Sequence, residues 1–241
     1  MMEAGSPGAF SVVIPFYNEE PNLRPLCRRL IPACEAVGSP FEVVLVDDGS
    51  TDGGGSIALG LASGDSRIRV VALESRSGQS AALDAGFRAA RHPIVVTMDA
   101  DLQNDPEDIP LLLAKLAEAD VACGVRTARH DNLVRRISSR IANRVRDRIT
   151  GDHVTDTGCS LKAYRAEYLR RLKLYTGMHR FLPTLLRFEG ARVIEVPVRH
   201  HPRVAGKSKY GIGNRALVGL RDCFAVRWMR DRRLRYRIKD S

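Results

Sequence analysis

The sequence predicts an α/β fold in which a mostly parallel sheet is flanked by helices. Apolar runs rich in Val and Ile recur in the first half of the chain, at residues 10–14, 41–46, 68–73, 94–98 and 120–123. Segments with helical spacing lie between these runs, at residues 22–37, 53–63, 79–91 and 107–119. Strands that alternate with helices are typical of βαβ units, which build parallel sheets. The runs lack in-and-out alternation, as a sheet covered on both faces requires.

The second half of the chain follows a less regular pattern. We expect a basic amphipathic helix over 133–149, strands at 160–164 and 192–198, and helices at 165–172 and 179–188. A polar loop over 200–210 leads to a final basic helix. Because no internal repeat or low-complexity linker interrupts the chain, we expect one domain over residues 1–210 and a basic amphipathic extension over 211–241.

The composition is that of a folded protein, since 44% of the 241 residues are apolar. The five cysteines form no CxxC pair, and the first residues lack the basic start and apolar stretch of an export signal. We therefore expect reduced thiols and a cytoplasmic location. No run of about eighteen apolar residues occurs, so no bilayer span is expected.

The charge is divided unevenly between the two halves of the chain. Residues 1–120 carry 9 Lys and Arg against 18 Asp and Glu, a net charge of −9. Residues 121–241 carry 29 against 10, a net charge of +19. An acidic half suits cation binding, whereas a basic half suits phosphates of a nucleotide, an anionic lipid or a nucleic acid.

Two carboxylates, Asp99 and Asp101, directly follow the apolar run at 94–98. Ligands of parallel α/β sheets bind at the carboxyl ends of the strands, where this pair should lie. Oxygen ligands suit Mg²⁺ or Mn²⁺, which usually also bind substrate phosphates. An isolated Asp-x-Asp sequence is more often a solvated turn, but its place after a buried strand favours a metal site.

Two further polar loops follow predicted strands. The sequence DDGSTD occupies residues 47–52, where Gly49 suits a tight turn that approaches a ligand and a neighbouring hydroxyl or Asp52 should cap the next helix. The sequence PFYNE occupies residues 15–19. Pro15 should end the ladder of the first strand, and Tyr17 either contacts a base or packs as an ordinary aromatic residue.

Several nucleotide-binding and hydrolytic motifs are missing from the sequence. No GxGxxG or GxxxxGK[ST] follows the predicted strands, which argues against dinucleotide oxidoreductases and P-loop NTPases. No GxSxG elbow occurs either. A nucleotide held by acidic loops and a metal ion remains the best explanation of the pattern.

The ordered motifs VVIPFYNE, VLVDDGSTD, GQSAALDAG and MDADLQNDP resemble those of the family 2 glycosyltransferases. The segments RRISSRIAN, DTGCSLKAYR, MHRFLP and GKSKY are similar to those of polyprenyl-phosphate glycosyltransferases, the group that contains the dolichyl-phosphate mannose synthases. The match runs from residue 11 to 210. It implies a GT-A-type, Rossmann-like fold and an inverting, metal-dependent hexosyltransferase that moves a sugar from a UDP- or GDP-linked donor to a polyprenyl phosphate.

The resemblance also implies roles for individual residues. The nucleotide would be held by Pro15, Tyr17, Glu19, Asp47 and, at the ribose, Asp99. The metal ion, Mg²⁺ or Mn²⁺, would be held by Asp99, Asp101 and Gln103. The acceptor and donor phosphates would be bound by Arg126, Arg135 or its neighbour Arg136, Arg180, Lys207 and Lys209. Asp156 would lie near the donor sugar.

The chemistry supports a phosphate acceptor but leaves another open. A phosphomonoester has a second pKa of about 6, so a nucleophilic dianion exists at neutral pH and no general base is needed. A saccharide or lipid hydroxyl would need a carboxylate base, for which Asp156 is the strong candidate. The many arginines favour the phosphate, because a guanidinium binds it in a bidentate manner.

A non-catalytic nucleic-acid-binding protein is a remote alternative. It accounts for the +19 charge but not for the acidic loops, and no aromatic platform accompanies the arginines, so we expect no nucleic-acid partner. His179, His200 and His201 are expected to form hydrogen bonds rather than to ligate the metal ion, which prefers oxygen.

The C-terminal helix is predicted to meet a membrane surface. Its apolar stripe, flanked by Arg221, Arg227 and Arg232, comprises Leu217, Leu220, Phe224 and Trp228. Such a helix can lie on an anionic membrane with Trp at the interface, or the stripe can pack on the protein's own domain. We expect a peripheral enzyme at the cytoplasmic face of a membrane, where a membrane-anchoring protein is another conceivable partner.

Overall fold

The computed structural model describes residues 8–127, 143–202 and 212–234. These residues fall into two compact units, one of residues 8–127 and 155–202 and the other of residues 143–154 and 212–234. The structure therefore groups the C-terminal residues with a segment from the middle of the chain. The domain boundary at residue 210 stays a prediction.

The larger unit contains a seven-stranded sheet with the order β3-β2-β1-β4-β6-β5-β7. The strands are β1 (Phe10–Phe16), β2 (Phe41–Asp47), β3 (Ile68–Ala72), β4 (Ile94–Thr97), β5 (Val121–Arg126), β6 (Lys162–Arg165) and β7 (Val193–Val198). All neighbouring pairs are parallel except those that β6 makes with β4 and β5. The predicted α/β class and the mostly parallel sheet are confirmed.

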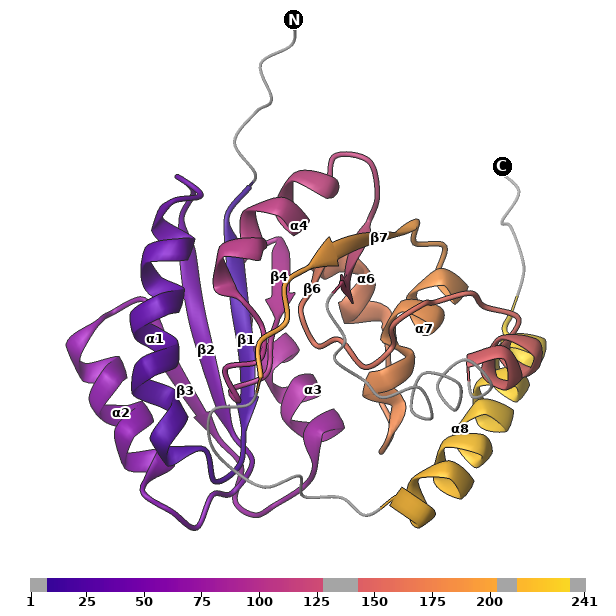
Figure 1. Cartoon of the computed structure of the whole chain (residues 1–241), viewed down its shortest axis with the longest axis horizontal. Coiled ribbons are helices and arrows are strands. Elements are labelled where there is room, and N and C mark those ends of the chain that lie inside the picture. Colours follow the sequence, from indigo (N-terminus) through magenta and orange to yellow (C-terminus); the bar gives the residue numbers. More distant parts are fainter. Residues whose placement is uncertain (1–7, 128–142, 203–211, 235–241) are drawn as a thin grey trace, which may run out of the picture. The chain divides into compact units, whose positions relative to one another are not determined.

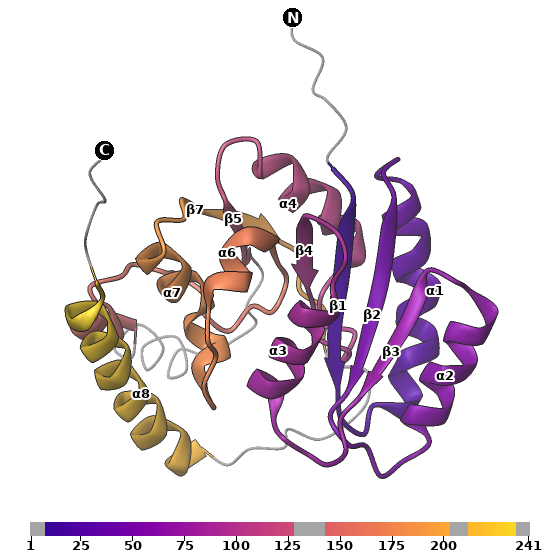
Figure 2. The ribbon, with the colours of Figure 1, turned by 180° about the vertical axis from the view of Figure 1, so that it is seen from behind.

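Helices cover both faces of this sheet. They are α1 (Glu20–Glu35), α2 (Gly54–Gly64), α3 (Gln79–Ala89), α4 (Ile109–Lys115), α6 (Ala166–Arg171) and α7 (Leu182–Phe188), with short 3₁₀ turns η1 (Pro106–Asp108) and η2 (Met178–Phe181). Figure 1 shows α1 and α2 on one side of the strands, and Figure 2, from behind, shows α3 on the other. Strands covered in this way are buried almost throughout, as β1 and β2 are.

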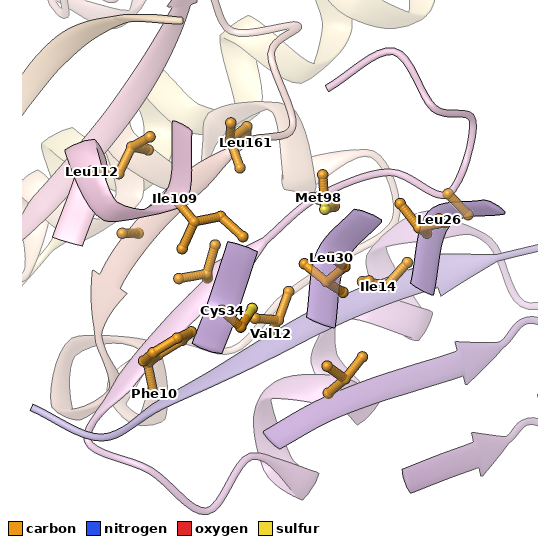
Figure 3. Close-up of a cluster of buried hydrophobic side chains, with 14 of the residues drawn as sticks. Phe10, Val12, Ile14, Leu26, Leu30, Cys34, Met98, Ile109, Leu112 and Leu161 are labelled. Carbon is orange, nitrogen blue, oxygen red and sulfur yellow. The ribbon is translucent and has the colours of Figure 1, made fainter. Parts of the chain in front are cut away.

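The core between the sheet and α1 and α4 is apolar and closely packed. Figure 3 shows Leu26 and Leu30 of α1 beside Val12 and Ile14 of β1, with Met98 nearby. A second cluster forms on the opposite face from residues of α3, α6 and α7. Burial of this kind contributes about 1.5–3 kcal/mol for each large apolar side chain. Both faces therefore fix the sheet whose ends carry the polar loops.

Pro15 does not end the ladder of the first strand, contrary to expectation. Strand β1 continues to Phe16, and Pro15 pairs with Val46 of β2. The carbonyl of Val13 accepts from Met98 on the β4 side, so Pro15, two residues on, also turns its backbone toward that side. The β4 ladder ends opposite Val13, and the missing N–H of Pro15 therefore costs no strand hydrogen bond.

The smaller unit contains the helix α8 (Ile212–Arg232) and a helix over residues 143–150. Arg230 of α8 donates from Nη1 to the carbonyl of Thr150 over 3.0 Å. Cys223 and Val226 are buried, whereas Leu220, Phe224 and Trp228 are exposed. Among the described residues, no helix has the length and hydrophobicity that a bilayer crossing requires.

Candidate active site

The three polar loops named from the sequence follow neighbouring parallel strands. Strands β2, β1 and β4 are adjacent in the sheet, and all three run in the same direction. Their carboxyl ends therefore lie at one edge of the sheet, where parallel α/β folds bind ligands. This edge brings together the loops that begin after Phe16, after β2 and after Thr97. The site is built on the most buried part of the sheet.

The loops after β1 and β2 brace one another. Asn18 has a left-handed φ of 51°. Its Oδ1 accepts a hydrogen bond from the backbone N–H of Thr51 over 2.8 Å. The backbone of Glu20 donates to Asp52 Oδ2 over 3.1 Å, and Glu20 accepts in return from Gly53 over 2.9 Å. Such reciprocal bonds hold two loops in a fixed relation. Asp52 Oδ1 also accepts from the backbone N–H of Gly54, but the N-cap of α2 is Gly53 and has no side-chain cap, so the expected cap by a neighbouring hydroxyl or Asp52 is wrong.

Asp47 and Asp48 lie at the end of β2 and accept hydrogen bonds from different loops. Asp47 Oδ1 accepts from the backbone of Ser50 over 2.8 Å, so it closes its own turn. Asp48 accepts from the backbone N–H groups of Ser77 and Gly78, at 2.7 and 3.0 Å, and thereby holds the loop that precedes α3. The sequence indicated Asp47 but gave no role to Asp48.

Gly49 is required by a close approach of protein backbone. Its φ is +70°, and a Cβ added there would lie 2.6 Å from the backbone nitrogen of Arg76. The expected tight turn is present, but the group that crowds it is the 75–76 segment. This contact sets Arg76 beside the first loop, with its guanidinium carbon 4.4 Å from the centre of the Tyr17 ring.

Arg76 is a candidate ligand-binding residue that no sequence motif indicated. It is exposed, and it follows β3 at the same edge of the sheet as the other loops. A guanidinium over an aromatic ring is a favourable cation–π contact. Its place after a predicted strand was the available signal, but the residue has no recognisable motif of its own.

Asp99 and Asp101 lie directly after β4, as predicted. Asp99 Oδ1 accepts from the side-chain amide of Gln79 over 3.0 Å, and Asp101 Oδ1 accepts from the backbone of Gln103 over 3.2 Å. Leu102, between Asp101 and Gln103, has a left-handed φ of 63°, an uncommon conformation for a branched residue that costs about 1–3 kcal/mol. The fold holds this loop in a strained turn, which is common at binding sites.

The donor set of this loop fits a hard divalent cation. Two carboxylates and the amide of Gln103 offer oxygen ligands, which Mg²⁺ and Mn²⁺ prefer, and leave coordination positions for phosphate and water. Among the residues that the structure describes, no group of three His, Cys, Asp or Glu could hold a metal ion without such help. An amide and substrate oxygens would therefore have to complete the coordination.

The segment after β7 is fastened to the Asp101–Gln103 loop. The backbone of His201 donates to the carbonyl of Gln103 over 2.8 Å, and His200 Nε2 lies 3.4 Å from Gln103 Nε2. His201 Nε2 lies 2.9 Å from Asp105 Oδ2. Asp105 also contacts Arg29 and Arg199, at 3.2 and 3.4 Å. Burial raises the pKa of Asp105, but His201, backbone and arginine contacts outweigh it and leave the pKa lowered.

Arg126 and Asp156 form a bidentate ion pair. Arg126 Nε and Nη2 each donate to one oxygen of Asp156 over 2.7 Å, and the backbone N–H of Arg126 adds a bond of 3.3 Å. Both side chains are largely buried. The two predicted site residues are thus brought together, although 30 residues separate them. Both oxygens of the candidate base are engaged by a cation.

Arg180 follows His179 in η2, which packs near the start of α3. His179 Nδ1 lies 2.8 Å from Ser80 Oγ. Burial, with Arg180 and Lys162 nearby, lowers the pKa of His179 to about 4, so this residue is neutral at physiological pH. Its contact with Ser80 places Arg180 beside the helix that also carries Gln79. Arg135, Arg136, Lys207 and Lys209 lie outside the described residues.

Comparisons with known proteins decide the family. A profile described as "Glycosyl transferase family 2" matches residues 11–173. This chain belongs to glycosyl transferase family 2. The profile match confirms the resemblance to family 2 glycosyltransferases that the sequence motifs indicated.

Named relatives carry the resemblance further. The chain is 41% identical over 204 residues to an undecaprenyl-phosphate 4-deoxy-4-formamido-L-arabinose transferase of Edwardsiella ictaluri, with 84% of this chain and 63% of that protein covered. It is 43% identical over 213 residues to a dodecaprenyl-phosphate galacturonate synthase of Rhizobium johnstonii, with 84% and 62% covered. The resemblance to polyprenyl-phosphate glycosyltransferases is confirmed. The chain spans less than two thirds of the length of these relatives.

Solved structures confirm the GT-A-type fold. A mannosyltransferase from Pyrobaculum calidifontis, solved with GDP-Man and Mn²⁺, superposes with a TM-score of 0.61 at 23% identity over 83% of this chain and 58% of that one. Glucosyl-3-phosphoglycerate synthase from Mycobacterium tuberculosis, solved with Mn²⁺, UDP and its product, gives 0.66 at 21% identity over 95% and 81%. At these identities the likeness concerns the fold.

Proposed function

We propose that this chain transfers a sugar from a UDP- or GDP-linked donor to a polyprenyl phosphate, with inversion at the anomeric carbon. The observation that carries the proposal is the placement of Asp99 and Asp101 after β4, beside the carboxyl ends of β1 and β2. Family membership and the two named prenyl-phosphate relatives support the same reaction class.

The nucleotide of the donor would lie against the loops after β1 and β2. Tyr17 offers a ring, Asp47 and Glu19 offer carboxylates, and Pro15 shapes the turn. Asp99 would meet the ribose as well as the metal ion. Bound by Asp99, Asp101 and Gln103, Mg²⁺ or Mn²⁺ would neutralise charge on the departing diphosphate.

The acceptor phosphate needs positioning rather than deprotonation. Its dianion forms above a second pKa of about 6, so the nucleophile exists at neutral pH. Arg126 is a suitable contact for it, because Asp156 holds its guanidinium in place and the planar guanidinium fork matches the geometry of a phosphate. Arg180, together with Arg135, Lys207 and Lys209, would supply further positive charge around the two phosphates.

The Arg126–Asp156 pair favours a phosphate acceptor over a hydroxyl acceptor. A general base must take a proton from the attacking hydroxyl, yet both Asp156 oxygens already accept from a guanidinium at 2.7 Å. Breaking one partner away from a largely buried pair is costly. Asp156 is better suited to hold Arg126 in place than to act as a base.

A direct assay separates these acceptors. Radiolabelled UDP- and GDP-sugars are offered with Mn²⁺ and either undecaprenyl phosphate or undecaprenol. We expect transfer to the phosphate alone, with a product of inverted anomeric configuration. Asp156→Asn, which keeps a hydrogen-bond acceptor, should retain more activity than Arg126→Ala. Transfer to undecaprenol, abolished by Asp156→Asn, would contradict the proposal.

The smaller unit would bring the enzyme to the cytoplasmic face of a membrane. Leu220, Phe224 and Trp228, spaced four residues apart on α8, are exposed by 39%, 54% and 64%. Exposed arginines flank this stripe, among them Arg221 and Arg227. An apolar stripe with basic flanks suits an anionic lipid surface. It also leaves open a membrane-anchoring protein as the partner.

Vesicle flotation tests the membrane assignment. The protein should float with vesicles that contain anionic phospholipid and lose this property when Phe224 and Trp228 are both changed to Ser. Leu59→Ser is a matched control, because Leu59 is also 61% exposed but lies alone on α2. If the double variant floats as well as the wild-type protein, α8 is not the membrane-binding element. If the wild-type protein binds a membrane protein but no vesicles, a membrane-anchoring partner is favoured.

A further inference from the structure

Asp99 is held through its backbone as well as through its side chain. Its N–H donates to Ser160 Oγ over 3.2 Å, and this hydroxyl in turn donates to Asn104 Oδ1 over 2.7 Å. One serine hydroxyl therefore links the first residue of the metal-binding loop with the residue just beyond Gln103. We call the Asp99–Ser160–Asn104 chain of bonds the relay.

Ser160 is itself fixed by the sheet. Thr97 Oγ1 donates to the carbonyl of Ser160 over 2.7 Å, and Thr97 pairs with Lys162 in the β4–β6 ladder. Lys162 is buried, and its Nζ donates to the carbonyl of Cys159, just before Ser160. The hydroxyl thus projects from a turn that is anchored at two neighbouring carbonyls.

Asn104 is the buried end of the relay. It is 3% exposed and forms an isolated bridge with His200. A buried amide without partners costs about 1–3 kcal/mol; the bond from Ser160 satisfies its oxygen and fixes its position, while its nitrogen donates to Cys159 Sγ. Because Asn104 directly follows Gln103, the relay restrains both ends of the loop that carries Asp99, Asp101 and Gln103.

We propose that Ser160 and Asn104 are positioning residues, which set the spacing of Asp99 and Gln103 before a metal ion binds. The inference rests on the proposed metal site. Mg²⁺ demands near-ideal octahedral geometry, so a loop whose ends are fixed binds it better than one whose ends can separate. Groups that orient ligands typically contribute about 10–100-fold to metal affinity.

Metal affinity tests the inference directly. Mn²⁺ is added stepwise to the protein in the presence of UDP, and in a parallel titration in the presence of GDP. Electron paramagnetic resonance measures the free Mn²⁺ at each step. Ser160→Ala and Asn104→Ala should each raise the dissociation constant of Mn²⁺ by about tenfold. The double variant should lose no more than the worse single variant, because both changes break one relay. Ser160→Thr, which keeps the hydroxyl, should restore affinity.

Ser11→Ala is the matched control. Ser11 is also a serine whose hydroxyl bonds a distant side chain, Glu42 Oε1 over 2.7 Å, but it lies near the start of β1. This variant should lose stability without losing Mn²⁺ affinity. If Ser160→Ala and Asn104→Ala instead behave like Ser11→Ala, or if the double variant shows fully additive losses, the inference is overturned and the proposed function stands. A wild-type protein that binds no Mn²⁺ with either nucleotide would overturn both.

Discussion

The two ends of β2 carry buried carboxylates with opposite kinds of partner. Near the start of the strands, Glu42 contacts the hydroxyl of Ser11, the backbone of Arg91 and the guanidinium of Arg69, the last at 2.9 Å. At the carboxyl ends, Asp47 and Asp48 accept chiefly from backbone N–H groups. Within the described part of the chain, no Lys, Arg or His side chain forms an ion pair with either aspartate.

We infer that this difference separates a structural carboxylate from one that is available for binding. A guanidinium cancels the charge of Glu42, whereas a backbone N–H holds an aspartate in place and leaves its net charge intact. The carboxyl end of β2 therefore keeps two negative charges, which would suit a cation or a ribose hydroxyl. Four predictions test whether the two ends have these separate tasks.

The largest effect is expected at the carboxyl end. Asp101→Asn keeps the size of the side chain but removes a negative metal ligand, so kcat should fall about 10³-fold while the melting temperature changes little. Steady-state transfer assays and thermal unfolding measure the two quantities. Full turnover by the variant would show that Asp101 does not bind the metal ion, and the comparison would fail.

The opposite end should govern stability. Glu42→Ala removes the partner of Arg69 and leaves the Ser11 hydroxyl without its acceptor, which should lower the free energy of unfolding by about 2–3 kcal/mol. Urea denaturation gives this value, and Mn²⁺ affinity with nucleotide should not change. A loss of Mn²⁺ affinity in the folded Glu42→Ala variant would contradict the view that Glu42 has a structural task only.

Glu42 should also make the free energy of unfolding depend on pH under acidic conditions, an effect smaller than that of Glu42→Ala. Burial raises its pKa, but bonds from Arg91, Ser11 and Arg69 outweigh burial and leave the pKa below its usual value. A lowered pKa adds stability above the unfolded value of about 4.3, and this stability is lost as the pH falls through the folded value. The free energy of unfolding of Glu42→Gln should therefore depend less steeply on pH below about 5. An unchanged slope would contradict the assignment.

The smallest effect concerns two arginines on aromatic rings. Arg76→Ala removes the cation over Tyr17 and should weaken nucleotide binding by about twofold to fivefold, since a cation–π contact is worth about 0.5–1 kcal/mol. Arg67→Ala is the control, because Arg67 lies over Phe41 near the start of β2, 4.9 Å from the ring centre. Nucleotide affinity is measured by calorimetry. If Arg76→Ala and Arg67→Ala change it equally, Arg76 does not contribute to nucleotide binding.

The positions of the loops were predictable because they follow from strand order in the chain. Apolar runs marked β1, β2 and β4, and the rule for parallel sheets then placed Tyr17, Asp47 and Asp99 at one edge. Element boundaries moved by a few residues, as for the expected helix at 107–119, where η1 and the shorter α4 are found. Pro15 was misread because its effect depends on where the β4 partner ends.

The sequence by itself determined the fold class, the family and the carboxylates after the strands, since each is written in local pattern and order. Tertiary structure decided the partners: Arg126 with Asp156, Ser160 with Asn104, and Arg76 with Tyr17. These pairs lie 30 or more residues apart and carry no local pattern. Only the packing of the sheet and its loops brings them within bonding distance, and short-range contacts of this kind decide what each charged group can do.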